Sequence, residues 1–234
     1  MSQASSLSAS ASVAPVRFSP KRVWTLAYAT MTQLMRMKIL PFLLLFCALV
    51  AAMGFGFSTI NPEQQLGLIK TVSLGTLQIF SLVIGIVSTA LLLPKDMEDR
   101  TLYTILSKPV PRFEYLAGKL VGVLLLIGGG LLIMDLVLSA VIYTRQGMVM
   151  QDMMRALEFD GQATPETIER LKGIIARQGL TWEMHWAVLA IFLKAAVVTS
   201  MALVLACIAS STLFTIVVAF CAVIIGHGEH LLRD

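Results

Sequence analysis

The sequence has 234 residues, of which 57% are hydrophobic and only 14% are charged. A soluble domain carries about 25% charged residues, so this composition, with a mean hydropathy of +0.82, excludes an ordinary soluble protein. The net charge of +4 does not indicate nucleic-acid binding, because the basic residues flank apolar runs and form no stripe. Long apolar runs without alternation favour helices over a transmembrane barrel. We therefore expect an all-α polytopic transmembrane bundle in a lipid bilayer.

The N-terminal segment divides into a tail and a predicted helix. Residues 1–16 are rich in Ser and Ala without a charged side chain, which predicts a disordered tail before a single transmembrane domain, 17–234. Ser19 and Pro20 are typical of a helix start. The helix that follows has basic residues at both ends and an apolar face, which favours a position in the membrane interface. The alternative is a solvated extension of the first span.

Apolar runs predict five membrane spans. The run 187–226 is too long for one span and suits two, and the polar cluster at 210–212 marks the turn between them. Two polar stretches separate the other spans. The predicted spans are 39–57, 72–93, 120–143, 187–208 and 212–226, with loops at 94–119 and 144–186.

The loop 144–186 is expected to contain an amphipathic helix. Thr164, Pro165 and Glu166 are typical of a helix start, and Gly179 is typical of a helix end. Trp182 and Trp186 would follow at the membrane surface, where aromatic residues are enriched. The apolar face of the helix would consist of Ile168, Leu171 and Ile175.

Basic residues near the span ends predict the orientation. Five lie before residue 39 and five lie in the loop 94–119, whereas the connector 58–71 has only Lys70. The N-terminus and the loop 94–119 are therefore expected on the cytoplasmic side. The connector and the loop 144–186 are expected outside.

The cytoplasmic loop has its own helix signals. Asp96 is a suitable N-cap after Pro94, and Pro109 with Pro111 would end the short helix. A second helix start follows at Arg112 and leads into the third span. A short helix held between two spans is suited to transmit a push from a soluble partner to the membrane helices.

The same loop combines an acid, a Thr-Leu pair, a Leu-Ser pair, a Pro-Val-x-Arg segment and a Gly-Lys pair. In this order, and over about 25 residues, the loop resembles that of the ABC-2 type transport permeases. Arg100 stands where that family commonly has Gly. The chain has five predicted spans, whereas members of the family usually have six, so it remains open whether the chain is a fragment that lacks a sixth span. The residues that carry the resemblance are Glu98, Thr101, Leu102, Leu106, Ser107, Pro109, Val110, Arg112, Glu114, Leu116, Gly118, Lys119 and Gly122.

The resemblance implies the membrane-spanning subunit of an ATP-driven exporter in a bacterial inner membrane. Such a subunit pairs with a second permease copy and is driven by a separate cytoplasmic ATPase that holds ATP and Mg, so no cofactor is expected in this chain. The sequence agrees, because it has no G-x-x-x-x-G-K-[ST] phosphate loop. The residues implied for coupling to the ATPase are Glu98, Thr101, Leu102, Pro109, Arg112 and Lys119.

The residues leave two other functions to consider. A membrane scaffold that anchors a cytoplasmic partner is the first alternative. An intramembrane enzyme is the second, but the chain has neither G-x-S-x-G nor H-E-x-x-H. We therefore expect a protein that is not itself an enzyme.

Two charged residues lie inside predicted spans. Asp135 is eight residues before Tyr143, and Lys194 is seven residues after Ala187, which predicts a similar depth of about 10–12 Å from the outer edge. Intramembrane charges are usually paired or face a cavity. We hypothesise an Asp135–Lys194 pair, or a place for both in a translocation path. The alternative is that Lys194 snorkels outward while Asp135 is protonated or bonded to a neighbouring helix.

The end of the chain carries a weak metal signal. His227 and His230 form an H-x-x-H pattern, but no cysteine accompanies them and Glu229 is the one carboxylate between them. We expect no metal site there.

Overall fold

The computed structural model describes residues 19–36, 45–46, 48–50, 52, 62–98, 111–161, 164–209 and 211–231. Throughout these residues every regular element is helical, which confirms the all-α fold class. Most of the predicted first span, 39–57, lies outside the described residues, as does the predicted tail. The helices are α1 (Pro20–Leu34), α3 (Pro62–Glu98), α5 (Arg112–Phe159), α6 (Pro165–Gln178), α7 (Trp182–Ile208) and α8 (Thr212–Leu231).

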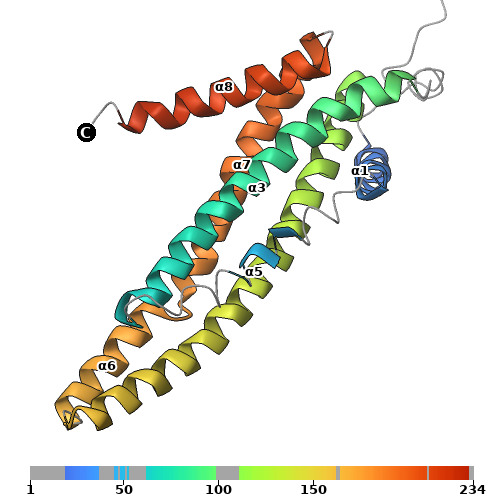
Figure 1. Cartoon of the computed structure of the whole chain (residues 1–234). Coiled ribbons are helices and arrows are strands. Elements are labelled where there is room, and N and C mark those ends of the chain that lie inside the picture. Colours follow the sequence, from blue (N-terminus) through green and yellow to red (C-terminus); the bar gives the residue numbers. More distant parts are fainter. Residues whose placement is uncertain are drawn as a thin grey trace, which may run out of the picture.

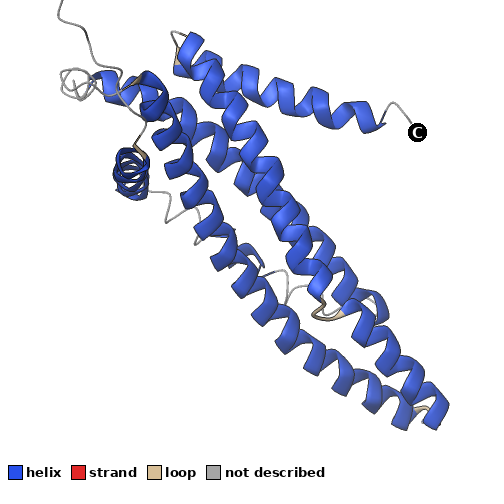
Figure 2. Ribbon diagram, turned by 180° about the vertical axis from the view of Figure 1, so that it is seen from behind, coloured by secondary structure: helices blue, strands red, loops and turns tan. Residues whose placement is uncertain are grey.

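Three long helices form the body of the molecule. In both views α3, α5 and α7 run side by side (Figures 1 and 2). The stretches Gln64–Leu92, Phe113–Phe159 and Pro165–Ile208 are each long and apolar enough to cross a membrane. The chain therefore has the character of a membrane protein. The shorter apolar helix Thr212–Gly228 within α8 turns away from the long axis of the three helices (Figure 1).

A single core joins the three long helices. Side chains one turn apart on α5 are buried against α3 and α7, because helical residues three or four positions apart share a face. Gly85 of α3 permits a close approach to α7, since a Cβ there would lie 2.5 Å from Oγ1 of Thr199. The buried α5 residues of this core are Val123, Ile127, Leu131, Met134, Leu138 and Ile142.

The predicted outer loop 144–186 is a helical hairpin. α5 continues past the predicted end of the third span and ends at Phe159, where Gly161 turns the chain with φ +67°. With 48 residues, α5 is about 72 Å long. The extension occurs because the stretch from Tyr143 to Phe159 contains no proline and only one glycine, Gly147, and a single glycine does not end a helix.

The second arm of the hairpin is α6, and its predicted ends are confirmed. Thr164 caps α6 through a reciprocal bond pattern with Thr167, Pro165 occupies the first position, and Gly179 follows the last turn. A small second core holds the two arms together. Its buried residues are Leu66, Val149, Met153, Leu171 and Ile175.

Lys70 fastens α3 to the turn between α6 and α7. Its Nζ donates to the carbonyl of Gly179 at 2.7 Å and to Oγ1 of Thr181 at 3.1 Å. A cation at the C-terminal end of a helix is also favoured by the helix dipole. The hairpin is thereby joined to the start of α7.

Two predicted boundaries of the loop 94–119 have different outcomes. Pro94 and Asp96 do not start a new helix, because α3 continues through both and ends at Glu98. The start at Arg112 is confirmed, with Pro111 as the N-cap of α5. The predicted turn near 210–212 is also confirmed, since α7 ends at Ile208 and α8 begins at Thr212.

We predict that Leu171→Ala loosens the hairpin. Leu171 is 6% exposed, and truncating such a side chain costs about 2–5 kcal/mol. Amide hydrogen exchange in α6 should become faster, while exchange in α3 and α7 stays slow. The neighbouring exposed position supplies the control, Lys172→Ala, which should leave α6 unchanged. Equal exchange rates in both variants would show that the small core does not hold α6.

Candidate functional site

The helix α1 crosses the beginning of α5. In Figures 1 and 2, α1 is seen nearly end-on while the three long helices lie across the picture. Its axis is therefore roughly perpendicular to theirs. Ala27, Thr30 and Leu34 are buried on one side of α1, whereas Trp24 and Tyr28 are 63% and 69% exposed.

Two glycines of α5 allow the helices to touch at the backbone. A Cβ on Gly118 would lie 2.6 Å from Cβ of Leu26, and a Cβ on Gly122 would lie 2.7 Å from the carbonyl oxygen of Ala27. Such distances leave no room for a side chain. Small residues four positions apart are a known means of close helix packing in membranes.

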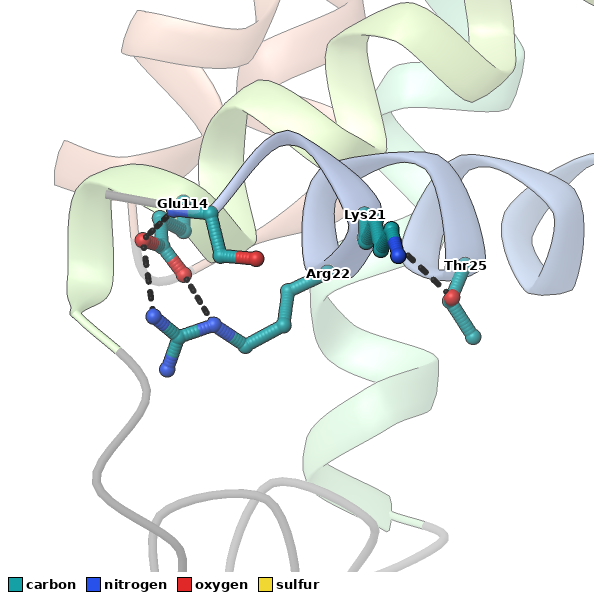
Figure 3. A network of polar contacts seen from close by, with 5 residues as sticks. Lys21, Arg22, Thr25 and Glu114 are labelled. Atoms are coloured by element: carbon teal, nitrogen blue, oxygen red, sulfur yellow. Dashed lines mark hydrogen bonds and ion pairs between the residues drawn. The ribbon is translucent and has the colours of Figure 1, made fainter. Parts of the chain in front are cut away.

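Glu114 forms the polar part of the same contact (Figure 3). Its side chain is 1% exposed, and its Oε2 lies 3.1 Å from Nε of Arg22. The backbone N–H of Ser19 donates to Oε1 at 2.9 Å, and Nη2 of Arg22 donates to the same oxygen at 3.4 Å. The Ser19 side chain makes no capping bond, so the Glu114 carboxylate satisfies a donor at the N-terminus of α1 and complements the helix dipole there.

Lys119 provides a second polar link about one and a half turns further along α5. Its Nζ donates to Oε1 of Gln33 at 3.2 Å and lies 5.7 Å from the centre of the Tyr115 ring. Lys119 is 5% exposed. The contact between α1 and α5 is therefore held by polar groups at both ends of α1 and by close packing in its middle.

The residues predicted to couple to an ATPase are described unequally. Lys119 lies in the α1 contact, Glu98 is the last residue of α3 and Arg112 is the first of α5. The side chains of Glu98 and Arg112, and the whole of Thr101, Leu102 and Pro109, lie outside the described residues. Sequence reasoning missed the Arg22–Glu114 pair, although α1 has basic residues without an acid of its own.

We predict that Glu114→Gln releases the start of α1. The substitution keeps the shape but removes the charge facing Arg22, and a hydrogen bond to a charged group is worth about 1.5–3 kcal/mol. Hydrogen exchange of the first amides of α1 should become faster. Asp152→Asn is the matched control, because Asp152 forms an exposed pair with Arg155 on the same helix. Unchanged exchange in Glu114→Gln would contradict the anchoring role of Glu114.

We also predict that Gly122→Leu separates α1 from α5. Inserting side-chain atoms where none fit costs about 1–3 kcal/mol. Trypsin should then cleave after Lys21 and Arg22 faster than in the wild type. Gly147→Leu on the same helix is the control, since a Cβ there meets nothing within 4 Å. Slow cleavage in both variants would argue against the close contact.

The predicted Asp135–Lys194 pair is wrong. Oδ2 of Asp135 instead accepts a hydrogen bond from Nδ1 of His185 at 2.7 Å. Nζ of Lys194 lies 3.0 Å from Nδ1 of His227 on α8. Both intramembrane charges therefore have imidazole partners.

The register of the helices explains this difference. A Cβ on Gly128 of α5 would lie 3.3 Å from the Phe192 ring of α7, so these two residues are level with each other. Asp135 and His185 are each seven positions away from them in antiparallel helices. Lys194 is consequently level with Leu126, about 13 Å along α5 from Asp135.

The Asp135–His185 pair borders a groove between α5 and α7. The groove has a volume of about 780 Å³ and is otherwise lined by apolar side chains and glycines, among them Gly128, Gly129 and Phe192. The rings of Trp182 and His185 pack in an edge-type arrangement with centroids 5.7 Å apart. Among the described residues no group of three or more His, Cys, Asp or Glu side chains is arranged to hold a metal ion.

Comparisons with family models, curated proteins and solved structures found no match to this chain.

Proposed function

We propose that this chain is the membrane-spanning subunit of an ATP-driven transporter, with ATP hydrolysis in a separate cytoplasmic subunit. The proposal combines the residue pattern of 98–122 with the packing of α1 against α5. It takes the ends of α3 and α5 that flank 99–110 as the cytoplasmic side of a bacterial inner membrane. Export is the direction that the resemblance implies.

One observation carries the proposal, namely the buried attachment of α1 to the first turns of α5. Pro111 and Arg112 begin α5, and Glu114 follows directly as the anchor of α1. A force applied to the segment before Pro111 therefore acts on α1 and α5 together. Because α5 runs without a break through the core of the long helices, the same force reaches every helix packed against it.

The orientation of α1 supports its proposed role at the membrane surface. If the three long helices cross the bilayer, a perpendicular helix at their end lies in the plane of the interface (Figure 1). Its exposed Trp24 and Tyr28 are side chains that favour the headgroup region. Lys21 is exposed on the same helix, where it is available to lipid headgroups or to a cytoplasmic partner.

The second permease copy is part of the same proposal. Several large apolar side chains of α5 and α7 are exposed although they lie inside the apolar stretches. Lipid or a second transmembrane subunit would cover them. These exposed side chains include Leu136, Leu193 and Val197.

The test is co-purification of the full chain from its native cells after solubilisation in detergent. We expect an ATPase to accompany the wild-type protein and to be lost with the double reversal Glu98→Lys and Arg112→Glu, because these charges flank the proposed docking segment. Gly147→Leu, remote from that segment, should retain the ATPase.

Two outcomes would contradict the proposal. Absence of an ATPase with the wild-type protein would favour a scaffold for another cytoplasmic partner. If the ATPase remains bound to the double-reversal variant, residues 98–112 do not dock the ATPase. A separate Glu114→Gln variant distinguishes docking from force transmission, since it should retain the ATPase while loosening α1.

A further inference from the structure

We propose that the groove between α5 and α7 binds a lipophilic organic cation, with its ammonium group at Asp135 and its apolar part against Phe192. This class of ligand is also a candidate cargo for the proposed transporter, so its biological meaning rests on that function. Its binding requires only this chain. The groove, the carboxylate and the glycines each support a separate part of the proposal.

The size and lining of the groove fit a small organic molecule. Its volume of about 780 Å³ lies within the range of about 300–1,000 Å³ found for ligand sites, which are mostly apolar with a few polar groups. Here the polar groups are the Asp135–His185 pair at one end. The remaining lining residues are apolar side chains and two glycines.

The chemistry of Asp135 determines the charge of the ligand. Oδ2 is bonded to His185, whereas Oδ1 has almost no exposed surface and accepts no hydrogen bond from any residue that the structure describes, so the carboxylate must turn to present it to the groove. A buried acceptor without a donor is costly, by about 1–3 kcal/mol. An ammonium group supplies both the N–H donor and the positive charge that a carboxylate in an apolar groove lacks.

The pair with His185 leaves room for a cation. The bond to His185 occupies only Oδ2 of Asp135, and the lysines of the neighbouring helices lie elsewhere. The nearest basic side chain along α7, Lys194, is engaged with His227 on α8 and lies about 13 Å away along the helices. Lys70, at the outer end of α3, donates to Gly179 and Thr181. Among the described side chains, these lysines are directed to other partners.

The distance along α5 between Gly128 and Asp135 determines the length of the ligand. Gly128 brings the Phe192 ring against the α5 backbone, and Gly129 borders the groove at a position where an added Cβ would meet nothing within 4 Å. Asp135 is seven residues from Gly128, which corresponds to about 10 Å. A phenyl ring joined to an amine by a four-carbon chain has this length.

The experiment measures equilibrium binding of radiolabelled phenylbutylamine to the full chain in lipid nanodiscs, after subtraction of empty nanodiscs. Phenylbutanol, which has the same shape without the charge, is the matched ligand. We expect the amine to bind the wild-type protein at least about tenfold more tightly than the alcohol, because the charge faces a carboxylate in a medium of low polarity. Asp135→Asn should remove this difference.

A second variant tests the space independently of the charge. Gly129→Leu should abolish binding of both ligands by filling the groove, and it should preserve folding because leucine is a better helix former than glycine. Gly147→Leu makes the same change at an open position of α5 and should bind the amine like the wild type. Circular dichroism verifies that each variant is helical.

Two results would overturn the inference. Equal affinities of amine and alcohol for the wild-type protein would show that the groove is an apolar surface for acyl chains or for a second copy. Undiminished binding to Gly129→Leu would locate the ligand elsewhere. Since no ATPase is present in the assay, failure here leaves the proposed coupling untouched, and failure to co-purify an ATPase leaves the cation site untouched.

Discussion

The contact of the buried Glu114 carboxylate with the start of α1 is the interaction on which the arrangement of α1 against α5 depends. A charged group with 1% exposure is stable only when its partners are held in place, because desolvation of an ion is expensive. Arg22 and the Ser19 amide supply these partners, and both belong to the beginning of α1. The requirement to satisfy one side chain thus determines where a separate helix begins and which way it crosses α5.

The same contact combines two kinds of specificity. Gly118 and Gly122 permit close approach, but shape alone would allow α1 to slide along the α5 surface. The links from Glu114 to Ser19 and from Lys119 to Gln33 attach opposite ends of α1 and so determine its register. Dispersion contacts account for the contact area between α1 and α5, while the polar links select one orientation of α1.

Local signals in the sequence are sufficient to predict several helix ends, but they do not predict which side chains pair between helices. The cap at Thr164, the end at Gly179 and the start at Arg112 all depend on neighbouring residues, and all are predictable. The extension of α5 to Phe159 is not predicted, because the polar composition favours a loop although the segment lacks a helix breaker. Depth alone pairs Asp135 with Lys194, whereas its partner His185 depends on the register between α5 and α7. Register is a long-range property that residue counting does not reveal.

The unbroken length of α5 has a mechanical consequence. A rigid rod about 72 Å long that pivots near its midpoint by about 5° moves each end by about 3 Å, in opposite directions. One end of this rod carries α1, and the other carries the hairpin with α6. A displacement of atomic size at one end of α5 would therefore appear at its other end without any intervening joint, so that α5 would work as a lever whose two arms are the halves of a single helix.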